Sequence, residues 1–133
     1  MDIKKRVLVA DDDTNILDLL RTGLEISGYM VDCADNAKKT MELIKFSRPD
    51  VILMDVSMPG EDGISFCRNL KNSEDTASIP VLILTAFSDG NTFNDAMLFG
   101  ASGFIAKPFE LSEVTKKIEN CIAKANTKKE HKK

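Results

Sequence analysis

The stretch Val51-Ile52-Leu53-Met54-Asp55 decides the fold of this chain. It is a continuous apolar run that ends in a carboxylate, and such a run is typical of a strand buried on both faces of a parallel sheet. Val7–Ala10 and Val81–Leu84 have the same character, Gly103–Ala106 is a further short run, and Tyr29–Ala34 alternates more, as a strand nearer a sheet edge does. The sequence therefore predicts five strands.

Segments with apolar residues at intervals of three and four separate these runs, and this period is that of a helix. We predict one helix that ends at Gly28, one that ends before Pro49, and three more over about 62–71, 89–99 and 109–125. Five strands that alternate with five helices predict the α/β class, with a doubly wound five-stranded parallel sheet.

The composition is that of one globular domain, with 133 residues of which 43% are hydrophobic and 29% are charged. We expect a domain over residues 1–125 and a basic, disordered tail over residues 126–133. No apolar run approaches the roughly 20 residues of a membrane span, and the N-terminus lacks the apolar core of a secretory signal. The sequence therefore predicts a cytoplasmic protein without membrane insertion, and its three cysteines, which form no CxxC pair, are expected to be buried, reduced thiols.

Charge is unevenly distributed along the chain. Residues 111–133 carry +4, whereas residues 1–110 carry −7. An acidic body argues against direct binding of nucleic acid by this domain. The single histidine, His131, lies two residues from the end of the chain, which argues against chemistry that depends on histidine.

Acidic side chains follow the first and third predicted strands. Because α/β sheets bind ligands at the carboxyl ends of their strands, Asp11 and Asp12 should lie close to Asp55. Three carboxylates in a small volume repel one another unless a cation lies among them, and oxygen ligands favour Mg²⁺ or Mn²⁺. Helix capping is the alternative, and we prefer it for Asp13 and for Asp35.

Two other uses of these aspartates fit the sequence less well. An EF-hand loop that begins at Asp11 would need glycine where Ile16 stands and a bidentate glutamate where Thr22 stands. A phosphatase of the haloacid dehalogenase type would need a late acidic pair, and the sequence contains no aspartate after Asp95.

Thr85 and Lys107 end the remaining two central strands. A lysine, a hydroxyl and a metal ion around one carboxylate can hold a phosphoryl group, because the cations neutralise its oxygens and the hydroxyl donates a hydrogen bond. Asp55 is the best candidate nucleophile, since it ends the most apolar central strand, and its product would be an acyl phosphate.

Over residues 4–124 the chain resembles the response-regulator receiver domains, the CheY-like family of two-component signalling. The resemblance rests on four motifs in the family's order: Val7-Leu-Val-Ala-Asp11-Asp12, Leu53-Met-Asp55-x-x-Met58-Pro59-Gly60-x-Asp62-Gly63, Leu84-Thr85-Ala86 and Gly100-Ala101-x-x-Phe104-x-x-Lys107-Pro108-Phe109. It implies a flavodoxin-like sheet with strand order 2-1-3-4-5, and a phosphoacceptor switch that assists its own phosphorylation and dephosphorylation rather than an enzyme.

The resemblance also implies partners and metal ligands. Asp55 would accept a phosphoryl group from a phosphohistidine on a sensor kinase or a histidine phosphotransfer protein. Asp12 would bind Mg²⁺ directly, Asp11 through water, and the backbone carbonyl of Ser57 would be a further ligand. Lys107 would pair with the phosphoryl oxygens.

The family further implies a switch. Thr85 would move towards the phosphoryl group and the ring of Phe104 would turn inward, although core packing is the alternative for Phe104, where many members have tyrosine. Ser57 and Phe87 would tune the phosphorylated lifetime. The surface of the fourth helix, fifth strand and fifth helix would contact a downstream protein target, with the chain a monomer or a phosphorylation-dependent dimer. An alternative is that the chain is the receiver portion of a longer regulator with a DNA-binding or enzymatic output domain.

Overall fold

The structure is a computed structural model, and it describes residues 4–56, 59–60, 62–86 and 100–131, the last six by their backbone alone. The described elements, in chain order, are β1 (Arg6–Ala10), α1 (Thr14–Ile26), β2 (Met30–Ala34), α2 (Ala37–Phe46), β3 (Val51–Asp55), α3 (Gly63–Asn72), β4 (Val81–Thr85), β5 (Gly103–Ala106) and α5 (Leu111–His131). The helix predicted over about 89–99 lies outside the described residues.

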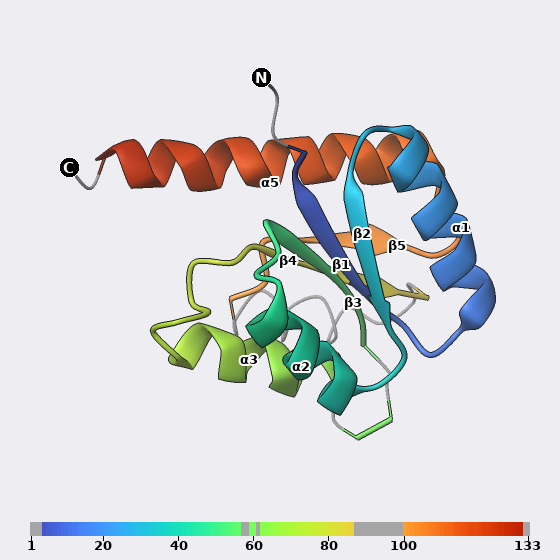
Figure 1. Cartoon of the computed structure of the whole chain (residues 1–133), viewed down its shortest axis with the longest axis horizontal. Helices are drawn as coiled ribbons and strands as arrows, with labels where there is room; N and C mark the ends of the chain where they lie inside the picture. The colour runs from blue at the N-terminus through green and yellow to red at the C-terminus, as the bar shows by residue number, and fades with distance from the viewer. Residues whose placement is uncertain (1–3, 57–58, 61, 87–99, 132–133) are drawn as a thin grey trace.

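All five predicted strands form one parallel sheet in the order β2-β1-β3-β4-β5, so the predicted fold and strand order are confirmed. Figure 1 shows this sheet at the centre of the molecule, with helices on both of its faces. Asp55 thus ends the central strand β3, between β1 and β4.

The continuous apolar runs are explained by two hydrophobic layers. Ile52 and Met54 pack with α2 and α3 in one cluster, which we call the α2/α3-side cluster. Val51 and Leu53 pack with α1 and α5 in the other, the α1/α5-side cluster. Because successive side chains of a strand point to opposite faces, a strand covered on both faces needs an apolar residue at every position.

Short polar side chains cap the N-termini of helices α1 and α2. Asp13 caps α1 by accepting a hydrogen bond from the backbone N–H of Asn15, as predicted. The prediction that Asp35 caps the next helix is wrong, because Asn36 accepts from the backbone N–H of Lys39 at the start of α2. Asp35 instead accepts a hydrogen bond from the Asn36 side chain.

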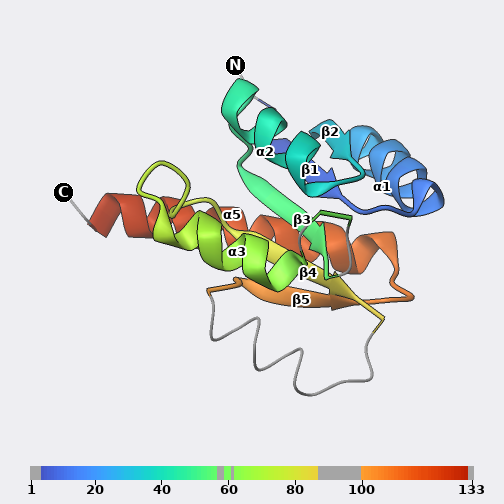
Figure 2. The same cartoon turned by 90° about the horizontal axis from the view of Figure 1, so that it is seen from below.

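Helix α5 continues to His131, through residues that the sequence analysis assigned to a disordered tail. In both views the end of α5 reaches past the sheet (Figures 1 and 2). The segment after residue 122 is rich in lysine and also contains two alanines, and both residue types favour helix, which explains the difference. The domain boundary at residue 125 stays a prediction. No described helix is both long and apolar enough to cross a lipid bilayer.

The three cysteines are free thiols. Cys67 and Cys121 are buried, as predicted, whereas Cys33 is only half-buried. Burial raises the pKa of all three thiols, which keeps them in the unreactive protonated form at neutral pH.

Asp62 at the start of α3 provides a test of helix capping. It accepts hydrogen bonds from the backbone N–H and the hydroxyl of Ser65, both at 2.9 Å, and the backbone bond is the main reason that the pKa of Asp62 is lowered. We expect Asp62→Ala to lower the free energy of unfolding at neutral pH by about 1 kcal/mol, measured by urea denaturation.

The pH dependence of this effect has a definite sign. A lowered pKa in the folded state stabilises the protein above the unfolded-state pKa of Asp62, and this contribution is lost as the pH falls through the folded-state value. The difference between wild type and Asp62→Ala should therefore shrink in acid, whereas Asp62→Asn should retain much of the cap. A difference that stays constant down to acid pH would contradict the assignment.

Candidate functional site

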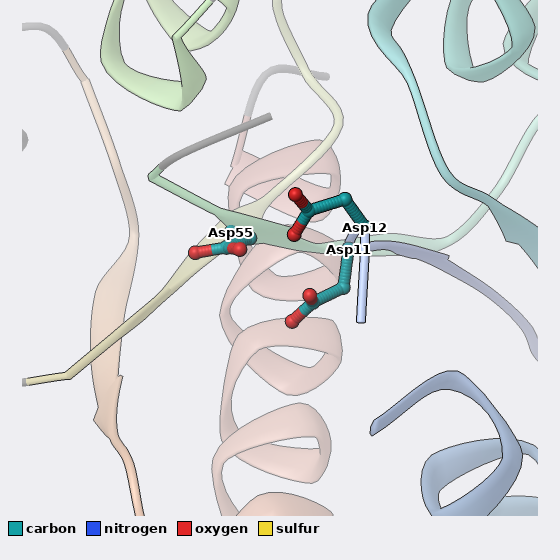
Figure 3. Close-up of side chains that lie close together, drawn as sticks. All are labelled: Asp11, Asp12 and Asp55. Atoms are coloured by element: carbon teal, nitrogen blue, oxygen red, sulfur yellow. The ribbon is translucent and has the colours of Figure 1, made fainter. Parts of the chain in front are cut away.

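Three carboxylates meet at the carboxyl-terminal edge of the sheet. Asp11 and Asp12 follow β1 and Asp55 ends β3, and one oxygen from each lies within 4.8 Å of the other two. Figure 3 shows the three side chains pointing toward one another across the neighbouring strand ends. The predicted convergence of these aspartates is confirmed.

The three carboxylates differ in their exposure to solvent. Asp11 is fully buried and Asp55 is only 9% exposed, whereas Asp12 is exposed. Asp11 accepts a hydrogen bond from the backbone N–H of Asp13 at 2.9 Å, which fixes its carboxylate against the start of α1. Within the cluster, the Asp11 carboxylate is therefore buried and held in place, whereas the Asp12 carboxylate is open to solvent.

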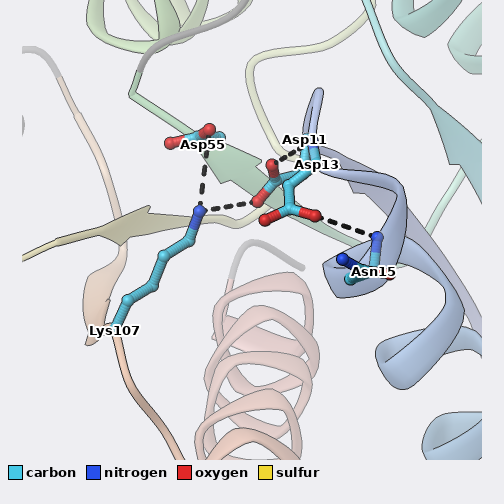
Figure 4. A network of polar contacts seen from close by, with 5 residues as sticks. All are labelled: Asp11, Asp13, Asn15, Asp55 and Lys107. Carbon is cyan, nitrogen blue, oxygen red and sulfur yellow. Dashed lines mark hydrogen bonds and ion pairs between the residues drawn. The ribbon is translucent and has the colours of Figure 1, made fainter.

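Lys107, directly after β5, places its ammonium between two of these carboxylates. Its Nζ donates to Asp11 Oδ2 at 2.8 Å and lies 3.6 Å from Asp55 Oδ2 (Figure 4). Burial acts to lower the pKa of Lys107, but the hydrogen bond and charge of Asp11 and the charge of Asp55 outweigh it, so that the pKa is raised. The ammonium is therefore a permanent counter-charge to the cluster at neutral pH.

The donor set fits a divalent cation. Every candidate ligand atom is a carboxylate oxygen, which is the donor that Mg²⁺ and Mn²⁺ prefer over nitrogen or sulfur. With Lys107 in place, the three carboxylates keep a formal charge of about −2, which such an ion would balance. The exposed position of Asp12 leaves room for the water ligands that Mg²⁺ retains.

Thr85 is half-buried at the end of β4, the strand next to Asp55. The backbone carbonyl of Thr85 accepts a hydrogen bond from the N–H of Lys107 at 2.7 Å, so these two predicted site residues are held side by side. Phe104 is 8% exposed, with its ring in the α2/α3-side cluster. The structure thus buries this ring, and the inward movement of Phe104 stays a prediction. Ser57 and Phe87 lie outside the described residues.

Sequence reasoning did not single out Gly63 for a role at the site. A Cβ at this position would lie 2.4 Å from the backbone oxygen of Asp55 and 3.0 Å from the Cα of Val56. The N–H of Gly63 donates to the carbonyl of Val56 at 2.7 Å, so α3 begins in direct contact with the backbone of the Asp55 segment. The available signal was a glycine at the first position of a helix, where a poor helix former indicates a close backbone approach.

Known proteins share both the sequence pattern and the fold. The family model of the response regulator receiver domain matches residues 7–119. The chain therefore belongs to the response regulator receiver family: it is a phosphoacceptor switch, with an acidic pocket of Asp11, Asp12 and Asp55 that serves phosphoaspartate signalling. Membership implies a cognate histidine kinase as a partner.

Individual relatives show how much of a longer protein the chain corresponds to. It is 32% identical over 125 residues to regulatory protein AtoC of Escherichia coli, which is 94% of this chain and 27% of that protein. It is 37% identical over 109 residues to the response regulator MprA of Mycolicibacterium vanbaalenii, which is 82% of this chain and 46% of that protein. The chain thus spans between about a quarter and about half the length of these curated relatives.

Solved structures of similar size have the same fold. A putative response regulator from Chloroflexus aurantiacus is 30% identical with a TM-score of 0.87, and the match covers 91% of this chain and 99% of that one. The chemotaxis response regulator CheY4 of Vibrio cholerae is 26% identical with a TM-score of 0.84, covering 90% of this chain and 99% of that one.

The contact between Gly63 and Asp55 can be tested with a matched pair of glycines. Gly63→Ala should lower the free energy of unfolding by about 1–3 kcal/mol, because the new methyl group meets backbone atoms that cannot rotate away. At Gly23 in α1 the three atoms nearest to the new methyl group belong to the side-chain end of Leu111, which can move. Gly23→Ala should therefore change stability by less than about 1 kcal/mol. Equal urea midpoints for the two variants would contradict this account.

Proposed function

We propose that this receiver accepts a phosphoryl group on Asp55 from a phosphohistidine of a sensor kinase or of a histidine phosphotransfer protein, in a reaction that depends on Mg²⁺. The observation that carries the proposal is the meeting of three carboxylates with the Lys107 ammonium at one edge of the sheet. Mn²⁺ would serve as an alternative ion, because it prefers the same oxygen ligands.

The proposed transfer is a displacement at phosphorus. A carboxylate oxygen of Asp55 forms a bond to phosphorus while the bond from phosphorus to the donor's imidazole nitrogen breaks, and the released imidazole takes up a proton. The product is an acyl phosphate. When bound, Mg²⁺ would neutralise charge on the phosphoryl oxygens.

The chain's own residues have distinct roles in this proposal. Asp12 and Asp55 would bind the ion directly, Asp11 through water, and the backbone carbonyl of Ser57 would complete the set of protein ligands. Lys107, 3.6 Å from Asp55, would pair with the phosphoryl oxygens, and the Thr85 hydroxyl would donate to one of them. Ser57 and Phe87 are proposed to tune the lifetime of the product.

The output of the switch is also part of the proposal. Movement of Thr85 and Phe104 would alter a surface formed by the predicted helix 89–99, β5 and α5, and a downstream protein would bind there. The chain would act as a monomer or as a dimer that forms on phosphorylation. We place it in the cytoplasm, without membrane insertion and without direct contact to nucleic acid by this domain.

A second candidate is that the chain is the receiver portion of a longer regulator with a DNA-binding or enzymatic output domain. The coverage of AtoC and MprA favours it, since the chain matches less than half of each. The match to 99% of two solved chains means that a chain of this length forms the complete fold, and it fits either candidate. The length of the native open reading frame decides between the two.

Phosphorylation is tested by intact-mass spectrometry after incubation with acetyl phosphate and Mg²⁺. We expect one added phosphoryl mass on the wild type, and none on Asp55→Asn or when the metal is chelated. Asp13→Asn is the matched control, because Asp13 caps α1 and is not among the three clustered carboxylates. An adduct on Asp55→Asn would contradict Asp55 as the acceptor.

Metal binding is tested by the effect of Mg²⁺ on unfolding. At a hundred times its Kd, Mg²⁺ should stabilise the wild type by about 2.7 kcal/mol. Asp12→Asn should remove most of this gain, and without metal it should be at least as stable as wild type, because one of three repelling charges is gone. Asp13→Asn should keep the gain. An undiminished response of Asp12→Asn would refute its role as a ligand.

A further inference from the structure

Lys117 in α5 makes a contact that the phosphorylation chemistry does not explain. Its Nζ donates a hydrogen bond to the backbone carbonyl of Phe104 in β5 at 2.5 Å, in a partly buried setting. Among the residues that the structure describes, Lys117 forms no ion pair. Its neighbour Lys116 is exposed. The ammonium of Lys117 thus contacts the backbone of β5 at Phe104.

Phe104 is held from both faces of the sheet. Its ring packs in the α2/α3-side cluster, whereas Lys117 belongs to α5, which covers the opposite face. Ile83 is the register partner of Phe104 on β4 and lies in the same cluster as the ring. The hydrogen bond from Lys117 therefore fixes the strand at the residue whose ring is buried on the other side.

The buried ring coexists with the ion pairs of the acidic pocket. Lys107 still contacts Asp11 and Asp55 in the arrangement in which Phe104 is 8% exposed. A phenylalanine ring carries no hydroxyl that would need a partner, so the hydrophobic effect favours its burial. The ring-buried arrangement of β5 is therefore compatible with the ion pairs that Lys107 makes with Asp11 and Asp55.

We propose that Lys117 is a positioning residue of the receiver, which holds β5 in the ring-buried arrangement and so raises the fraction of molecules ready to accept a phosphoryl group. The proposal rests on the proposed function of Asp55. A contact made in only one of two arrangements shifts the equilibrium towards that arrangement, and the observed rate scales with the population of the competent one.

The first test compares the initial rates of phosphorylation by acetyl phosphate with Mg²⁺ in four proteins. Lys117→Met should react about fivefold more slowly than wild type, the lower end of typical coupling between distant sites. Lys117→Arg should keep most of the rate, because it can still donate to the carbonyl, and Lys116→Met should react as wild type does. A purely structural contact would lower the unfolding midpoint of Lys117→Met without a change in rate, and that result, or a faster rate, would overturn the proposal.

The second test does not depend on phosphorylation. In wild type without any phosphodonor, NMR should show nuclear Overhauser effects between the Phe104 ring and the Ile83 methyl groups. These effects should weaken in Lys117→Met and persist in Lys117→Arg and Lys116→Met. Undiminished effects in Lys117→Met would overturn the proposal. Should Lys117→Met not fold, Lys117→Gln takes its place in both tests.

The two tests also separate this proposal from the proposed function. If the wild type takes up no phosphoryl group, the proposed function fails, and the ring contacts alone then decide whether Lys117 positions β5. If the wild type is phosphorylated but Lys117→Met shows the same rate and the same ring contacts, only the role of Lys117 is refuted.

Discussion

The mutual repulsion of three carboxylates at one edge of the sheet is the constraint on which the site depends. Asp11, Asp12 and Asp55 are brought within 4.8 Å of one another by the ends of adjacent strands, and the Lys107 ammonium offsets part of their charge. The packed sheet must supply the free energy that holds them there. A cation that enters this pocket meets carboxylates already in place, and a phosphoryl group meets the Lys107 ammonium. Little reorganisation is therefore needed on binding.

The sheet can hold this arrangement because its central strands are covered on both faces. Val51 to Met54 are fully buried, and side chains of β3 alternate between the two hydrophobic clusters. Burial of large apolar side chains contributes roughly 1.5–3 kcal/mol each, so a few such residues outweigh the repulsion among the carboxylates. The free energy gained by burying the apolar core therefore offsets the repulsion at the acidic edge of the sheet.

The strands and the convergence of the acidic residues were predictable from the sequence, because both follow from the spacing of apolar residues along the chain. The continuous apolar runs predicted parallel strands, and the rule that strand ends meet at one edge placed Asp11 and Asp12 beside Asp55. Details that depend on close contacts were not predictable in this way. The glycine at the start of α3 signals a close backbone approach, but that Gly63 meets the Asp55 backbone is visible only in three dimensions. Asn36 displaced Asp35 as the cap of α2 through a one-residue difference in where the helix begins. The structure continues α5 to His131, where charge and polarity had suggested a disordered tail, because lysine and alanine also favour helix.

The alternation of side chains along β5 has a thermodynamic consequence. Phe104 packs in the cluster on one face of the sheet and Ile105 in the cluster on the other, so one short backbone segment belongs to both layers. A ligand that shifts this segment changes the packing of α2 and α3 together with that of α1 and α5. Two partners that bind on opposite faces and prefer different positions of β5 would therefore compete without touching each other, and each would weaken the affinity of the other by the same factor.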